Sequence, residues 1–261
     1  MSTGFSHAFA TQRQVLWALM LREIHVMQGD TSLGYLWEIL KSAFGVAVFW
    51  AIRTFSGFHT STGMHVLLFL VMGFIPLYIF TNILSKGLKI VSGNLNLLTF
   101  PHITPLDLSL SSALVIIVTQ LTIMVLFIGI MLLIKIEVIL LDPISLGFGL
   151  MGLFSFSYGA SLAVAALNLY VPVVGQILPM ILRVSFFCSG VFFSTAQMAR
   201  IVGDWIMWNP LACYIELLRG AFLSPVPVET AKVNYVVPVT LVALALGLIL
   251  ERYTRKKVMK A

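Results

Sequence analysis

Residues 108–134 read LSLSSALVIIVTQLTIMVLFIGIMLLI and contain no Asp, Glu, Lys or Arg. Crossing a hydrocarbon core of roughly 30 Å takes about 20 residues of apolar helix, so this stretch predicts a membrane-spanning helix. The rest of the chain agrees, because 59% of its 261 residues are hydrophobic and 10% are charged. Soluble domains carry roughly 25% charged residues. The chain is therefore predicted to be an all-α, polytopic membrane protein.

Other apolar runs extend the pattern on both sides of this segment. They predict further spans at 34–55, 66–84, 144–167, 173–193 and 236–250, which gives six in all within a single domain, 1–261. No linker or internal repeat divides the chain.

The stretch 205–223 is also apolar, but it carries Pro210, Glu216 and Arg219. An ionisable group at the centre of a membrane helix costs about 2.5–3.5 kcal/mol. We therefore expect short re-entrant or interfacial helices, broken at Asn209-Pro210, within an outer segment 194–234.

Lys and Arg indicate the orientation. With the N-terminus inside, the cytoplasmic segments hold nine of these residues and the external segments hold four. The positive-inside rule then places both termini in the cytoplasm, as six spans require. A seventh span would put the basic tail ERYTRKKVMKA (251–261) outside. Because the remaining basic residues are scattered, we expect no nucleic-acid partner.

A different helix is expected before the first span, over residues 10–28. Trp17, Met20, Ile24 and Met27 recur on one face at spacings of 3, 4 and 3, and polar residues occupy another face. This pattern is typical of a helix that lies in the membrane interface. The alternative is a soluble amphipathic helix packed on a partner.

Motifs for energy conversion or catalysis are missing. Gly147, Gly149 and Gly152 form a literal GxGxxG inside an expected span, where small residues favour close helix packing. The chain has no GxxxxGK[ST], HExxH or GxSxG, and no carboxylate or His at mid-depth of a span. Cys188 and Cys213 lack metal-ligand spacing, and whether they pair is left open. We expect no cofactor or metal in this chain, and energy supplied by another subunit.

The internal loop 85–107, SKGLKIVSGNLNLLTFPHITPLD, is long for a connection between helices. Its apolar segment and its prolines predict a short helix parallel to the membrane that presents an apolar knob to a cytoplasmic partner. The alternative is an ordinary packed connection. The predicted coupling residues are Asn94, Leu95, Asn96, Leu97 and Leu98.

Arg183 lies about ten residues into the fifth expected span, close to the midplane. An arginine at that depth should face a polar interior, where its guanidinium can bind phosphate or carboxylate. The predicted substrate path consists of Arg183, Gln176, Phe186, Phe187 and Tyr158. Alternatively, Arg183 is satisfied by backbone carbonyls and by neighbours such as Asn168 or Tyr158.

Glu216 and Arg219 are spaced i, i+3 and can pair across one helical turn. We expect an outer gate, or a docking surface for an external partner, at Trp208, Asn209, Pro210, Glu216 and Arg219. The alternative is a solvated interfacial ion pair.

Three segments together carry a family resemblance: LREIHVMQGDTSLGYLWEIL (21–40), NLNLLTFPHITPLD (94–107) and WNPLACYIELLRGAF (208–222). They resemble the first-span segment, the coupling-helix loop and the segment before the last span in permeases of ABC exporters of the second type. The match is nearest to the permease subunits of capsular-polysaccharide exporters. Relatives read LW-x-I-L-E-P where this chain has Lys41-Ser42, and Glu38 and Lys41 are close enough to pair.

The resemblance implies a homodimer in a bacterial inner membrane, bound to two cytoplasmic subunits that hold ATP and Mg. It further implies export of a lipid-linked, acidic capsular polysaccharide, with an adaptor for onward export. The alternatives are a permease for O-antigen, teichoic acid or another glycolipid, and an intramembrane enzyme acting on lipid-linked sugars.

Overall fold

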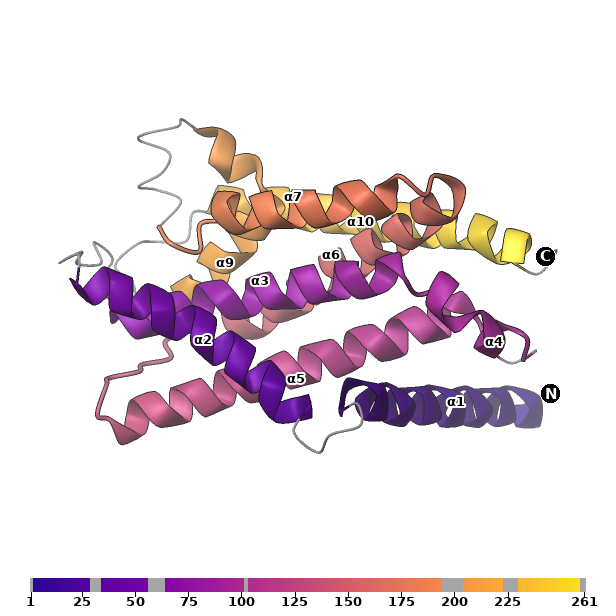
Figure 1. Cartoon of the computed structure of the whole chain (residues 1–261), viewed down its shortest axis with the longest axis horizontal. Coiled ribbons are helices and arrows are strands. Elements are labelled where there is room, and N and C mark those ends of the chain that lie inside the picture. Colours follow the sequence, from indigo (N-terminus) through magenta and orange to yellow (C-terminus); the bar gives the residue numbers. More distant parts are fainter. Residues whose placement is uncertain are drawn as a thin grey trace.

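The computed structural model describes residues 2–28, 34–55, 64–100, 103–193, 204–222 and 230–258. Its regular elements over these residues are all helices, apart from one isolated bridge between Leu140 and Phe222, which confirms the all-α class (Figure 1). The longer helices are α1 (Ser2–Gln28), α2 (Gly34–Phe55), α3 (Val66–Leu88), α5 (Pro105–Leu133), α6 (Pro143–Tyr170), α7 (Val174–Cys188) and α10 (Thr230–Val258). The shorter ones are η1 (Ser92–Asn94), α4 (Leu95–Leu98), η2 (Asp204–Trp208) and α9 (Pro210–Gly220).

Within the described ranges, four helices are long and apolar enough to cross a membrane: α3, α5, α6 and residues Val233–Arg255 of α10. The chain is thus a multi-pass membrane protein by the length and composition of its helices. α7 is apolar but has 15 residues, and α2, with Glu38, Lys41 and Arg53, falls outside this group. Both nevertheless coincide closely with predicted spans.

Local sequence explains where three of the helices begin. Thr104, Asp142 and Asn209 are the N-cap residues of α5, α6 and α9, and each is followed by proline at the first helical position. Their side-chain oxygens accept hydrogen bonds from backbone N–H groups that would otherwise lack partners, and proline is tolerated where no N–H is needed. The predicted helix break at Asn209-Pro210 is therefore confirmed. Residues 194–203 and 223–229 of the expected outer segment lie outside the described residues.

α3 forms the centre of the apolar core. Fifteen of its residues are buried, and it contacts α2, α5, α6, α7 and α9. By contrast, α7 buries only Leu178 and Leu182 among the described residues.

α6 packs closely against α10 through small residues. A Cβ at Gly159 would lie 2.6 Å from the backbone N of Leu244, and one at Gly247 would collide with the carbonyl of Gly159. Gly149 and Gly152 likewise face Leu218 and Tyr214 of α9, as expected for glycines that permit close helix packing.

Both termini lie at the same end of the molecule as α4 (Figure 1). α9 lies toward the opposite end, near the start of α3. The predicted coupling loop and the predicted outer segment are thus separated by the length of the helical bundle.

Candidate functional site

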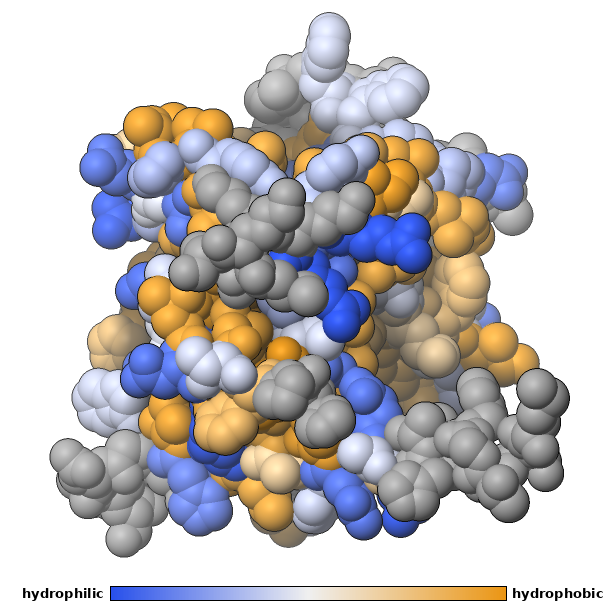
Figure 2. Space-filling model, turned by 90° about the vertical axis from the view of Figure 1, so that its right-hand side faces the viewer, coloured by the Kyte–Doolittle hydropathy of each residue, from blue (hydrophilic) through white to orange (hydrophobic). Residues whose placement is uncertain are grey.

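A cavity of about 1050 Å³ opens near the end that carries α4 and both termini. Its walls come from α1, α2, α3, the loop that contains α4, α5 and α7. Figure 2 looks onto this end, where strongly hydrophilic side chains lie among apolar ones. The cavity lining shows the same mixture, because charged residues of α1 and α3 face apolar residues of α7 such as Leu178 and Leu182.

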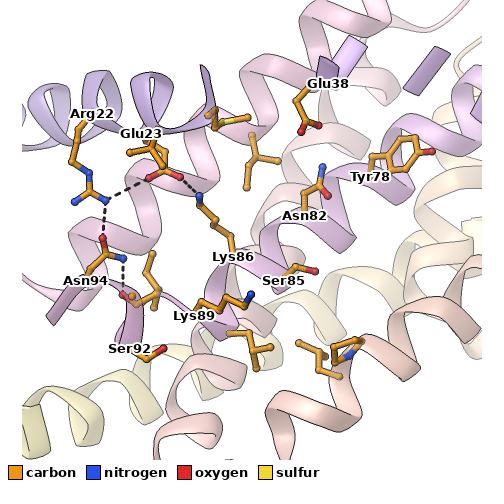
Figure 3. Close-up of a pocket in the computed structure, with 18 of the residues that line it drawn as sticks. Arg22, Glu23, Glu38, Tyr78, Asn82, Ser85, Lys86, Lys89, Ser92 and Asn94 are labelled. Carbon is orange, nitrogen blue, oxygen red and sulfur yellow. Dashed lines mark hydrogen bonds and ion pairs between the residues drawn. The ribbon is translucent and has the colours of Figure 1, made fainter. Parts of the chain in front are cut away.

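Polar contacts at the rim of this cavity join α1 to the coupling loop. The Arg22 guanidinium donates to the Asn94 side-chain carbonyl at 2.7 Å, and the Asn94 amide donates to the Ile90 carbonyl at 2.9 Å (Figure 3). The buried Glu23 carboxylate pairs with Lys86 of α3 at 2.6 Å and with Arg22 at 3.7 Å.

Another contact fixes the earlier part of α1. The Gln12 amide donates to the Asp107 carboxylate, which also accepts from the backbone N–H of Thr104 at 3.0 Å. Asp107 thereby caps α5 and holds α1 at once. Side-chain contacts therefore join α1 to α3, to α5 and to the coupling loop.

The apolar residues of the coupling loop face in two directions. Leu97 and Leu98 are half-buried and pack on a cluster that includes Leu19 of α1. Leu95 and Phe100 are 57% and 58% exposed. Of the five predicted coupling residues, Leu95 and Asn96 are therefore exposed, whereas Asn94, Leu97 and Leu98 contact the rest of the chain.

Phe100 was not among the predicted coupling residues. Its position just before Pro101, at the end of the helix, was the available signal. The surface formed by Leu95, Asn96 and Phe100 is called the coupling knob below.

The structure does not bring all residues of the predicted substrate path together. Arg183 and Gln176 are exposed on α7, and Phe187 is 64% exposed. Phe186 belongs to an aromatic cluster, with its ring centroid 5.8 Å from that of Phe74 and 5.0 Å from that of Phe192.

Tyr158 lies apart from this group. It is a buried residue of α6 that faces the start of α5, where its hydroxyl accepts a hydrogen bond from Ser109 at 3.3 Å. Asn168, the other suggested neighbour of Arg183, donates to the Leu88 carbonyl at 2.9 Å. Neither residue therefore satisfies Arg183.

The predicted outer gate contains a buried arginine. Arg219 is 2% exposed, and its guanidinium donates to the carbonyls of Phe69, Gly190 and Val191 at 2.7–3.3 Å. It also lies 3.5 Å from the centroid of the Phe69 ring. The alternative of a solvated Glu216–Arg219 pair is wrong for Arg219, because backbone carbonyls replace water around the guanidinium.

The other predicted gate residues hold α9 in place. The Asn209 side chain caps α9 and donates to the Cys188 carbonyl at 3.0 Å. Trp208 is exposed, and its carbonyl accepts from the Tyr235 hydroxyl at 2.6 Å. Pro210 is the first residue of α9, and Glu216 is half-buried. Cys188 is exposed and Cys213 is buried.

A polar stripe on α3 was missed in the sequence. Tyr78, Asn82 and Ser85 of α3 and its C-cap residue Lys89 all line the cavity, and their spacings of 4, 3 and 4 place them along one side of the helix. Gln120 of α5 lines the cavity as well. These amides and hydroxyls carry no charge, and their helical spacing within apolar spans is the signal that the sequence offers for them.

Comparison with known proteins finds relatives over nearly the whole chain. A family model described as ABC-2 type transporter matches residues 14–223. Polysialic acid transport protein KpsM of Escherichia coli is 28% identical over 256 residues, covering 96% of this chain and 97% of KpsM.

Two capsule polysaccharide export inner-membrane proteins are also similar. BexB of Haemophilus influenzae is 24% identical over 263 residues, covering 98% of this chain and 97% of BexB. CtrC of Neisseria meningitidis serogroup B is 25% identical over 256 residues, covering 94% of this chain and 93% of CtrC.

Proposed function

The chain belongs to the ABC-2 type transporter family, and from this we propose that it is the permease subunit of an exporter that moves capsular polysaccharide across a bacterial inner membrane. The observation that carries the proposal is the similarity to KpsM, BexB and CtrC over almost the full length of both partners in each comparison. Members of this family are transport subunits that work with an ATP-binding subunit, so the alternative of an intramembrane enzyme is set aside.

We propose that six helices cross the membrane, namely α2, α3, α5, α6, α7 and α10. α2 and α7 then join the four helices that meet the requirements of length and composition. Both termini and α4 lie in the cytoplasm in this arrangement, in agreement with the excess of Lys and Arg. η2 and α9 form a re-entrant segment on the outer side.

The proposed assembly is a homodimer bound to two cytoplasmic ATPase subunits, which hold ATP and Mg. The coupling knob supports this assembly, because exposed apolar side chains at a helix end fit a groove of a partner protein. Closure of the ATPases pushes on α4, and the contacts of Asn94 with Arg22 pass that movement to α1. An inner-membrane or periplasmic adaptor receives the polymer on the outer side.

We propose that the exported polymer is acidic and lipid-linked, and that it passes along α7. Arg183 and Gln176 are exposed on this helix, and the rings of Phe186 and Phe187 lie one turn further on. Guanidinium groups bind phosphate and carboxylate, while aromatic faces offer contact area for sugar rings.

Deletion of the gene tests the proposed function. Capsule should disappear from the cell surface and accumulate inside, and a plasmid copy of the gene should restore it. Normal surface capsule together with an internal build-up of O-antigen or teichoic acid would instead support a permease for another glycolipid.

A further inference from the structure

Gln120 of α5 is a buried polar residue of the cavity lining. It is 2% exposed, and its side-chain carbonyl oxygen is buried without a hydrogen-bond partner among the described residues. A buried polar atom without a partner costs about 1–3 kcal/mol of stability, so such atoms are rare. Because Gln120 lines the cavity, a hydrogen-bond donor inside the cavity can supply the missing partner.

The unpartnered oxygen of Gln120 lies far from both ends of α5. Gln120 lies 12 residues after Leu108, which is about 18 Å along the helix, near the middle of a roughly 30 Å hydrocarbon core. The cavity also reaches the coupling loop at Asn94 and Leu97. It therefore leads from the cytoplasmic edge of the protein to mid-membrane.

The polar stripe of α3 connects these two levels. From Lys89 to Tyr78 it covers about 16 Å of helix, with Ser85 and Asn82 between them (Figure 3). Tyr78 and Asn82 are half-buried. Hydroxyl and amide groups both donate and accept hydrogen bonds, so the stripe can bind a ligand rich in hydroxyl groups along its length.

The mouth of the cavity carries a cation that is available to an anion. Within the described part of the chain, Lys41 pairs with Glu38 at 2.8 Å and Lys86 with Glu23 at 2.6 Å. Lys89 is exposed and its ammonium makes no comparable contact among those residues. The lining thus changes from a cationic mouth to neutral hydrogen-bonding groups at depth.

We propose that this cavity is a carbohydrate-binding site that faces the cytoplasm. Gln120, Asn82 and Tyr78 bind hydroxyl groups of a sugar ring, and Lys89 meets an anionic group at the mouth. The inference rests on the proposed function, since the ligand is the part of the exported glycolipid that enters the permease first. The apolar residues Leu178 and Leu182 of α7 form the opposite wall and contact its less polar portion.

Photocrosslinking in capsule-producing cells tests the proposal with the native ligand. A photoreactive benzoylphenylalanine is introduced at Ser85, which is exposed and lines the cavity, or at Val118, which is exposed on α5 and does not line it. After illumination, mass spectrometry of the purified full-length protein should find sugar-containing adducts at position 85. At position 118 it should find membrane lipid alone.

Substitutions at Gln120 and Asn82 complete the test. Gln120→Leu should lower the yield of sugar adducts at position 85 about five- to tenfold, because a buried hydrogen bond is lost. The matched control Thr119→Val, at a buried polar residue of the same helix outside the cavity lining, should leave the yield unchanged. Asn82→Ala, at a half-buried position, provides the same test if Gln120→Leu fails to fold.

Sugar-free adducts at position 85 would overturn the inference. So would a sugar yield that neither Gln120→Leu nor Asn82→Ala lowers in folded protein. Either result would leave the proposed function intact if deletion of the gene still abolishes surface capsule. Normal capsule in the deletion strain would instead contradict the proposed function itself.

Discussion

Two arginines show how the same side chain serves different purposes in this protein. Arg219 is enclosed by three backbone carbonyls and an aromatic ring. It therefore connects α9 to the start of α3 and to the residues that follow α7. Arg183 is exposed on α7, which buries only Leu178 and Leu182 among its residues. We interpret the first as a structural residue and the second as a candidate for substrate contact.

Replacing Arg219 by Met should destabilise the protein. Three buried carbonyls lose their donor, at about 1–3 kcal/mol for each unsatisfied group. The apparent Tm of the detergent-purified protein should fall by about 6 °C or more. Lys135→Met, which removes an exposed cation, serves as the control and should leave Tm unchanged. An unaltered Tm for Arg219→Met combined with lost export would assign Arg219 to the gate instead.

Replacing Arg183 by Ala should reduce export about tenfold while leaving membrane abundance and ATPase assembly unchanged. The reason is the loss of a charge-assisted hydrogen bond to the substrate, worth about 1.5–3 kcal/mol. Arg183→Lys keeps the charge but not the planar, two-pronged donor, so it should restore export only in part. Quantification of surface capsule measures both effects. Normal export by Arg183→Ala, or its failure to fold, would contradict the assignment.

At the scale of elements, polar contacts join α1 to α3 and to the coupling loop. Arg22 and Glu23 of α1 bind Asn94 and Lys86, and Leu19 packs on Ile90 and Val91 beneath the coupling loop. α4 has four residues, too few for a stable isolated helix, so its position depends on these contacts.

Two double variants separate the two sides of α4. Leu95→Ser with Phe100→Ser should lower co-purification of the ATPase at least tenfold and leave the Tm of the permease unchanged, because exposed contact residues are lost. Leu97→Ser with Leu98→Ser should lower Tm, since both side chains pack on the cluster around Leu19. If the first variant assembles and exports normally, the coupling knob does not bind the ATPase.

The sequence predicted the elements better than the faces they present. Apolar length and the Asn209-Pro210 signal placed most helices within a few residues of their observed bounds. The inward side of α4 could not be predicted, because Leu95, Leu97 and Leu98 are alike in polarity and differ only in their neighbours. The carbonyl groups that surround Arg219 could not be predicted from the sequence either. Its acceptors are backbone groups of residues 69, 190 and 191, which sequence pattern does not identify.

At the scale of the whole molecule, charge and architecture agree. Both termini and the coupling loop lie at one end, and the sequence places most Lys and Arg in segments at that end (Figure 1). The cavity opens near the same end, as a site loaded from the cytoplasm requires.

Cysteine labelling can test this orientation. In a variant without Cys188 and Cys213, single cysteines are placed at Lys135 and at Arg255. A membrane-impermeant maleimide should label position 135 in spheroplasts and position 255 only after permeabilisation, because the basic end stays in the cytoplasm. Labelling of position 255 from outside would reverse the proposed topology.

The uneven burial of the helices has a mechanical consequence. α3 buries fifteen residues, and α6 and α10 are locked backbone to backbone at Gly159 and Gly247, so these helices form a stiff frame. α7 buries Leu178 and Leu182 and places Phe186 in the aromatic cluster, so shifting it uncovers less apolar surface than shifting α3. We therefore expect α7, the helix that carries Arg183, to shift more readily than this frame.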